Sequence, residues 1–372
     1  FQNDMLWNYM RNDLDSEYWR MHSARWDRIT VPVYTVGNWG GFSMHLRGNT
    51  EAFLNAASRH KKLRIHTGTH FHPFHSEEGR MDQLRWFDYW LKGIDTGIMD
   101  EPPVKLEIRT GGSRQRYPFR FEQEWPLART RWTKLYLRGD RRPTGNAGDL
   151  EGELADTPAA AETRLTYSAS GATAAGIASG SSLATTHGNT GRTGVSFVTA
   201  PMAEDTEVTG PLTLRVWVSS TSEDMDVFVT IRNMAPDGSD VCEVGQHGQP
   251  VPCVTKGWLR ASHRKLDPSR SLPYRPYHAH DERWWLKGDE PVACDVEIWS
   301  TSMVFKKGHR LRLDIQPRDG VGSAPYTHYH ADYNAGAQNS IHTGGDRASY
   351  LLIPLIPPGA EGRRRTGVQE RV

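Results

Sequence analysis

The chain has 372 residues and a formal net charge of +1, with 45 Lys and Arg against 44 Asp and Glu. This near balance gives no electrostatic argument for a nucleic acid or an acidic membrane surface as a partner. The sequence contains no apolar run of about 18 residues and no charged-then-apolar leader, so we expect a cytoplasmic protein without a membrane span. The length exceeds that of one typical core, and two domains are expected.

The cysteines bear on whether the chain contains a disulfide, and the first residue bears on whether the chain is a fragment. Cys242, Cys253 and Cys294 are an odd number in a long sequence. Reduced thiols are therefore expected, and a disulfide between Cys242 and Cys253 is the alternative. The sequence begins at Phe1 rather than at Met, with a pattern typical of the interior of a domain. We therefore expect a fragment or a processed chain.

Residues 1–100 alternate strand and helix patterns. Residues 29–36 form a short run rich in β-branched side chains, which predicts a buried strand, and residues 63–66 are predicted to form a second short strand. Helices are predicted from about Asn49 to Lys61, with Asn49 as the N-cap, and over 81–91, ending at Gly93. A strand–helix–strand–helix order predicts parallel pairing, so residues 1–128 are interpreted as an α/β domain.

After Pro102 and Pro103 the hydrophobic period changes to two. Apolar residues alternate with polar ones over 212–218, 227–231 and 311–315, between turns rich in Gly, Pro and Asp. This pattern is typical of an antiparallel β-sandwich, which we assign to residues 129–372. Residues 157–194 are rich in Ala, Gly, Ser and Thr, and they are expected to form a long surface excursion.

Two loops follow the predicted parallel strands. Residues 37–42 follow the first strand, and residues 67–72 follow the second. Ligands of open parallel sheets bind at the carboxyl ends of the strands, so the two loops should be neighbours, with His70 beside the first loop. An imidazole titrates near neutral pH, and this property suits His70 to general acid–base chemistry.

Several motifs resemble those of the cocaine-esterase family of α/β-hydrolases, which includes X-Pro dipeptidyl-peptidases. They are Val31-Pro32-Val33, Gly37-Asn38-Trp39-Gly40-Gly41, Ile65-His66-Thr67-Gly68-Thr69-His70 and Trp86-Phe87-Asp88-Tyr89-Trp90-Leu91-Lys92-Gly93. Similar stretches continue through residues 257–264 and 305–313. The resemblance implies the C-terminal part of an α/β-hydrolase sheet over 1–128, followed by a galactose-binding-like jelly-roll β-sandwich over 129–372.

The same resemblance implies an activity. His70 falls on the catalytic base of a triad in which the serine comes first along the chain, then the acid, then the histidine. The serine is therefore expected before Phe1, since the nearest match to a nucleophile elbow, residues 180–184, follows no predicted strand and comes after His70. The implied reaction is cleavage of an ester or X-Pro amide bond in a small-molecule or peptide substrate, through an acyl-enzyme and without a cofactor.

The triad acid departs from the family pattern. Gly41 stands at the position of the family's aspartate, and loss of that acid costs about four orders of magnitude in turnover in a serine protease. Glu77 and Glu78 are the leading replacements, and a backbone carbonyl from residues 38–41 is the alternative. Asn38 and Trp39 are assigned to substrate binding, with Trp39 as a wall of an acyl pocket.

Three interpretations remain open at this stage. The first is a hydrolase whose serine lies in an absent N-terminal segment, and the second is a catalytically decayed relative or binding protein. The third is a two-chain hydrolase, with the serine on another polypeptide. If residues are missing, the strand at 31–36 should have an exposed hydrophobic edge or pair with another chain. The histidines of residues 66–75 are not expected to hold a metal, since no cysteine lies nearby, and a homo-oligomer is left open.

Overall fold

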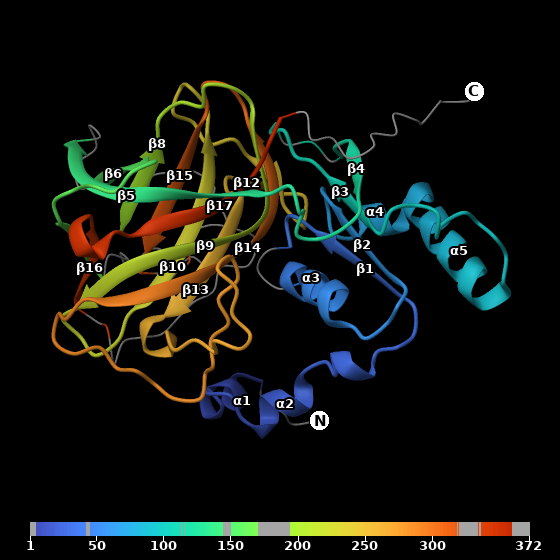
Figure 1. The fold of residues 1–372 in the computed structure, drawn as a ribbon, viewed down its shortest axis with the longest axis horizontal. Coiled ribbons are helices and arrows are strands. Elements are labelled where there is room, and N and C mark those ends of the chain that lie inside the picture. The colour runs from blue at the N-terminus through green and yellow to red at the C-terminus, as the bar shows by residue number, and fades with distance from the viewer. Residues whose placement is uncertain are drawn as a thin grey trace.

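The chain forms a small and a large β-sheet that lie side by side, with most helices around the small one (Figure 1). The computed structural model describes residues 5–41, 45–112, 114, 116–143, 150–169, 194–317, 319, 334 and 336–358. The serine-rich stretch at 180–184 thus lies outside the described residues. None of the described helices is long and apolar enough to cross a membrane.

The small sheet has the strand order β1-β2-β3-β4. Its strands are β1 (Val33–Asn38), β2 (Lys61–His66), β3 (Val104–Glu107) and β4 (Phe119–Glu122). β1 and β2 run parallel, as the strand–helix order predicted. β3, which the sequence did not predict, also pairs parallel with β2, and β4 pairs antiparallel with β3. The helical segments of the first hundred residues are α1 (Met5–Arg11), α2 (Glu17–His22), η1 (Trp26–Arg28), α3 (Leu46–Asn55), α4 (His72–His75) and α5 (Glu77–Lys92).

Of the two long helices, α5 matches the sequence prediction, whereas the predicted start of α3 is wrong. α3 begins after His45, so Asn49 lies inside the helix, where its side-chain amide donates to the Val36 carbonyl at 3.1 Å and ties α3 to β1. The prediction of Asn49 as an N-cap is therefore wrong. α5 begins after Ser76, whose hydroxyl oxygen accepts a backbone hydrogen bond, and it ends at Gly93 in the left-handed conformation, as predicted.

One edge of the small sheet is open. β1 is an outermost strand and has no neighbour on its far side among the described strands. Val31 and Val36 are exposed near this edge, and α5 exposes an apolar stripe made of Met81, Leu84, Phe87 and Leu91. Native proteins usually cover such edges and stripes. The predicted exposed edge is confirmed for this part of the chain.

The large sheet has eleven strands among the described residues, and it closes on itself because β14 pairs with both β13 and β9. All its strand pairs are antiparallel apart from β6 with β8. Its strands are β5 (Arg131–Pro143), β6 (Leu150–Ala155), β7 (Thr163–Ser168), β8 (Val195–Thr199), β9 (Thr206–Ser220), β10 (Asp226–Met234), β13 (Thr255–Arg260), β14 (Val292–Phe305), β15 (Arg310–Gln316), β16 (Gln338–Thr343) and β17 (Tyr350–Ile356). The short remaining elements are β11 (Glu243–Val244), β12 (Pro250–Val251), η3 (Ala261–His263) and η4 (Gly345–Arg347).

The period-2 runs predicted three of the described strands of this sheet. Residues 212–218, 227–231 and 311–315 lie in β9, β10 and β15. The expected surface excursion at 157–194 is wrong for its first part, because β7 occupies residues 163–168 and pairs with β16. Residues 170–193 lie outside the described part of the chain.

The buried apolar side chains form two clusters, one inside the large sheet and one that joins the small sheet to residues of the larger part such as Val251, Cys253 and Ile356. Charges and thiols are buried as well. Asp314 is buried and accepts hydrogen bonds from Arg232 and Arg312, both at 2.6 Å. No disulfide joins any of the three cysteines in the structure. Burial raises the pKa of Cys253 to about 11 and that of Cys294 to about 12, which keeps both as unreactive thiols.

Candidate functional site

The loops that follow β1 and β2 meet at the carboxyl end of the small sheet. The backbone N–H of Trp39 donates to the carbonyl of His66 at 2.9 Å, which extends the pairing of the two strands. The side-chain amide of Asn38 donates to the carbonyl of Gly68 at 2.9 Å, and its oxygen accepts from the Gly40 N–H at 2.7 Å. The prediction that these loops are neighbours is confirmed.

His70 lies on the second of these loops. Its ring stacks on His45, at the start of α3, with ring centroids 5.2 Å apart. Its Nδ1 is buried and has no hydrogen-bond partner among the described residues. Burial is the main cause that lowers the pKa of His70, and the nearby His45 and His247 lower it further. The imidazole is therefore neutral at physiological pH and able to accept a proton.

A short hairpin from the larger part of the chain completes this region. It consists of β11 and β12, with residues 245–249 between them. The carbonyl of Gln246 accepts the backbone N–H of His70 at 2.7 Å. A Cβ atom at Gly248 would lie 3.4 Å from the methyl group of Thr69. The hairpin thus packs directly on the His70 loop, a contact that no sequence pattern predicted.

The same hairpin reaches Gly41. A Cβ atom at Gly41 would lie 3.7 Å from Oε1 of Gln246 and 3.1 Å from the Asn38 carbonyl oxygen. Gly41 carries no side chain, so no carboxylate stands at this position. The side-chain amide of Gln246 lies next to it instead, and its Oε1 is buried and has no hydrogen-bond partner among the described residues.

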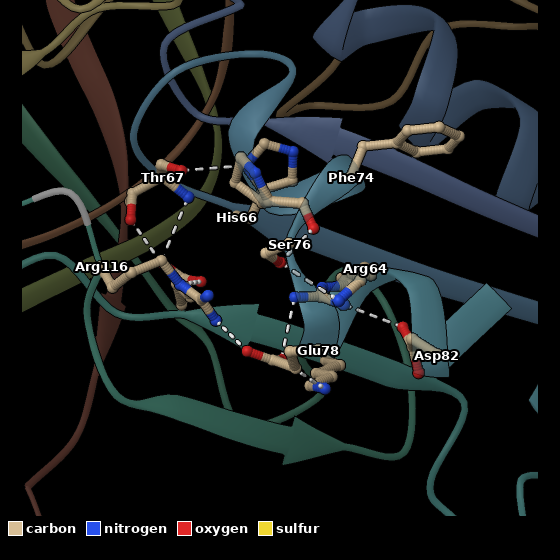
Figure 2. Close-up of polar contacts among 12 residues, drawn as sticks. Arg64, His66, Thr67, Phe74, Ser76, Glu78, Asp82 and Arg116 are labelled. Atoms are coloured by element: carbon tan, nitrogen blue, oxygen red, sulfur yellow. Dashed lines mark hydrogen bonds and ion pairs between the residues drawn. The ribbon is translucent and has the colours of Figure 1, made fainter. Parts of the chain in front are cut away.

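The two glutamates predicted as replacement acids are placed elsewhere. Figure 2 shows Glu78 on α5 pointing toward Arg64 and Arg116. Its carboxylate pairs with Arg64 at 3.1 Å, with Lys105 at 3.5 Å and with Arg116 at 2.6 Å. These cations hold the pKa of Glu78 below its usual range, against the effect of burial. The replacement-acid hypothesis is thus wrong for Glu78, because its oxygens are committed to three cations.

Glu77 is exposed in the first turn of α5. It does not orient the histidine either, since Nδ1 of His70 has no partner among the described residues. Asp82, the other acid near in sequence, bonds to Arg64 at 2.9 Å and to the hydroxyl of Tyr34 at 2.6 Å. The carboxylates of Glu78 and Asp82 therefore hold α5 on the sheet through Arg64.

Glu107, at the end of β3, holds the start of the His70 loop. It is 1% exposed. Its carboxylate accepts hydrogen bonds from both the backbone N–H and the hydroxyl of Thr67, and from Nε of Arg116 at 3.0 Å. Arg116 in turn bonds to Glu78, so a chain of charges runs from the loop to α5 (Figure 2). Sequence analysis did not predict this clamp.

We expect Glu107→Gln to lower the free energy of unfolding by about 1–3 kcal/mol, because a buried charge-assisted acceptor is lost. Thermal and urea unfolding measure the effect. Glu77→Gln is the matched control, since the same chemical change on an exposed side chain should leave the unfolding midpoint unchanged. Equal midpoints for both variants would contradict the clamp.

His66 is the last residue of β2 and lies beneath the loop. Its Nδ1 is 3.0 Å from the carbonyl oxygen of Thr67. Burial lowers the pKa of His66 to about 4, so this ring is neutral and structural. Among the described residues, no group of three or more His, Cys, Asp or Glu side chains is arranged to hold a metal ion.

Asn38 and Trp39 were predicted to bind substrate, and the structure places both in the interior. Trp39 is 1% exposed, packs near Trp125, and donates its indole N–H to the Glu107 carbonyl at 2.8 Å. Asn38 is buried, and both ends of its amide are bonded to the two loops. The prediction is corrected on this point, because a buried and fully bonded side chain offers no face to a substrate.

A cavity of about 130 Å³ lies between α3, β14 and residues 272–275. Its charged lining residues are paired, Arg47 with Glu297 at 2.9 Å and Arg275 with Glu51 at 2.7 Å. Its lining does not include His70. This cavity therefore belongs to the contact between α3 and the large sheet.

Comparison with known protein families matches residues 96–352 to the family described as "X-Pro dipeptidyl-peptidase C-terminal non-catalytic domain". The chain belongs to this family. The matched residues include β3, β4 and the strands of the large sheet from β5 to β16, and they end within β17. Together with the relatives described below, this match shows that the chain is CocE/NonD-like and corresponds to the C-terminal portion of that family's proteins.

Relatives in sequence and structure agree with this assignment. A protein of Mycobacterium bovis named "Putative serine esterase" is 28% identical over 284 residues, which are 74% of this chain and 41% of the relative. The cocaine esterase of a Rhodococcus species is 23% identical over 73% of this chain and 45% of its own. A CocE/NonD family hydrolase of Staphylococcus aureus has a TM-score of 0.80 at 25% identity, over 95% of this chain and 59% of its own.

The chain thus spans less than half the length of these curated relatives. An aminopeptidase of a marine sediment archaeon shares the fold, with a TM-score of 0.64 at 15% identity. The sequence resemblance to the cocaine-esterase family is confirmed, and the names of these relatives are those of esterases and a hydrolase.

Proposed function

We propose that this CocE/NonD-like chain belongs to a serine hydrolase that cleaves ester or X-Pro amide bonds through an acyl-enzyme, with His70 as the general base. One observation carries the proposal. A neutral histidine with a buried, unpaired Nδ1 stands at the carboxyl end of a parallel sheet, where such sheets bind ligands. The names of the relatives, which include esterases and an X-Pro dipeptidyl-peptidase, support this reaction class.

In this mechanism the two ring nitrogens of His70 have different tasks. Nδ1 is buried in the protein, which leaves Nε2 to exchange protons with the reactants. Nε2 would take the proton of the attacking serine and then give it to the leaving alcohol or amine. The lowered pKa of His70 keeps the base form populated at neutral pH.

We propose that the serine comes from a segment outside this sequence or from a second polypeptide. The open edge of β1 and the apolar stripe of α5 support this, since both are surfaces that a continuing sheet and its helices would cover. A catalytically decayed relative is the second candidate, and the absence of a carboxylate at Gly41 favours it.

The finer architecture belongs to the same proposal. We propose that the large sheet is a galactose-binding-like jelly roll covering residues 129–372, with the hydrolase part over 1–128 and a cytoplasmic location. The closed sheet from β5 onward supports the jelly-roll assignment.

The test is hydrolysis by the whole protein that contains this sequence. We expect turnover of p-nitrophenyl esters of short acyl chains, or of an X-Pro p-nitroanilide, measured by release of nitrophenol or nitroaniline. We also expect loss of turnover after treatment with an organophosphate that phosphorylates active serines. No turnover of either class above the buffer rate would favour the decayed relative.

A further inference from the structure

Two buried polar atoms without partners lie in the same small region. They are Nδ1 of His70 and Oε1 of Gln246. The residues are in direct contact, because the Gln246 carbonyl accepts the His70 N–H at 2.7 Å. Oε1 of Gln246 also stands 3.7 Å from the place of a Cβ atom at Gly41. An acceptor from the β11–β12 hairpin is thus present where the loop after β1 supplies no side chain.

The physical cost of this arrangement favours a bond between the two. A buried polar atom left unpaired costs about 1–3 kcal/mol, and a proton on Nδ1 of His70 would give the amide oxygen of Gln246 a donor. The orientation of the amide is compatible with such a bond. Nε2 of Gln246 lies 3.2 Å from Nε2 of His247, which gives the amide N–H₂ its own acceptor and leaves Oε1 for another donor.

We propose that Gln246 is the positioning residue of His70, with its Oε1 accepting the Nδ1–H of the imidazole in the working protein. This inference rests on the proposed role of His70 as a base. The bond would fix the tautomer that leaves Nε2 free to take a proton, which is one of the two tasks of a triad carboxylate. A neutral amide would perform the other task poorly, since it stabilises the imidazolium less than a charged acceptor does.

The decisive variant is therefore Gln246→Glu, made in the whole protein. A carboxylate in place of the Gln246 amide would stabilise the charged ring, so we expect the pKa of His70 to rise by about one unit or more. NMR titration of the ring protons measures this pKa. The acidic limb of the pH–kcat profile should move to higher pH by the same amount. Gln249→Glu is the matched control, because it adds the same charge to the same hairpin and should shift the pKa of His70 much less.

Gln246→Met removes the acceptor at similar volume, and we expect kcat to fall about tenfold or more while KM stays near its original value. Rescue by glutamate but not by methionine would identify an acceptor rather than a packing role. If Gln246→Glu and Gln249→Glu shift the pKa of His70 equally, the positioning role is overturned, even if methionine prevents folding.

The two proposals fail in different ways. A large shift of the His70 pKa in Gln246→Glu, without hydrolysis of any substrate, supports the contact and contradicts the hydrolase function. Hydrolysis with an unchanged His70 pKa keeps the function and overturns the role of Gln246.

Discussion

Replacing His70 by alanine is expected to lower kcat/KM for an ester substrate by about four orders of magnitude or more, with little change in the midpoint of thermal unfolding. The loss is large because removal of the base also disables the serine, and the members of such a unit act together. The ring is only partly buried and packs on one face against His45, so folding depends little on it. Initial rates at several substrate concentrations, with parallel thermal melts, measure both effects.

His75→Ala is the matched control for this experiment. His75 is an exposed histidine on α4, a few residues along the chain, and its ring contacts Phe71 and Phe74. We expect it to retain full turnover. Activity within tenfold of the original protein in His70→Ala would remove His70 from the mechanism.

Replacing Asp314 by alanine is expected to lower the free energy of unfolding by about 3–5 kcal/mol. The variant leaves Arg232 and Arg312 buried without their shared carboxylate, and a buried charge that loses its partner is strongly destabilising. Urea unfolding followed by circular dichroism measures the loss. Asp237→Ala, at an exposed turn, serves as the control and should have the same free energy of unfolding as the original protein. A loss below 1 kcal/mol in Asp314→Ala would contradict this account.

The carboxylate of Asp314 should also make the free energy of unfolding depend on pH. The two arginines hold the pKa of Asp314 at about 2 in the folded protein, against 3.8 as its ordinary value, although burial alone would raise it. Its stabilising effect is therefore complete above pH 3.8 and is lost as the pH falls toward 2, a difference of about 2 kcal/mol. Unfolding free energies measured between pH 5 and pH 2 should fall less steeply in Asp314→Ala than in the original protein.

The parts of the fold that could be predicted are those encoded by neighbouring residues. β1, β2 and α5 follow from short apolar runs and from the glycine at 93, because period and cap are local signals. β7 was missed because its run Thr163–Ser168 has few apolar residues and is paired by β16, far away in sequence. The closure of the large sheet through β14 and β9 likewise has no local signal.

The candidate site could likewise be predicted from the sequence only in part. His70 could be predicted to lie beside the first loop, because strand order alone brings these loops together. Glu78 was misplaced because closeness in sequence to His70 was taken as closeness in space, whereas three cations from other elements bind its carboxylate. Gln246 could not be predicted at all, since two strands of two residues each leave almost no periodic pattern.

The two sheets are also joined by a cation. Arg109 follows β3, is buried, and donates to the carbonyls of Ser302 at 2.8 Å and Val254 at 3.0 Å and to the hydroxyl of Thr301. All three acceptors belong to the large-sheet part of the chain, and burial lowers the pKa of the guanidinium group. If the small sheet melted alone, these acceptors would lose their donor in a nearly dry interior. The two sheets should therefore melt as one cooperative unit, with a single calorimetric transition.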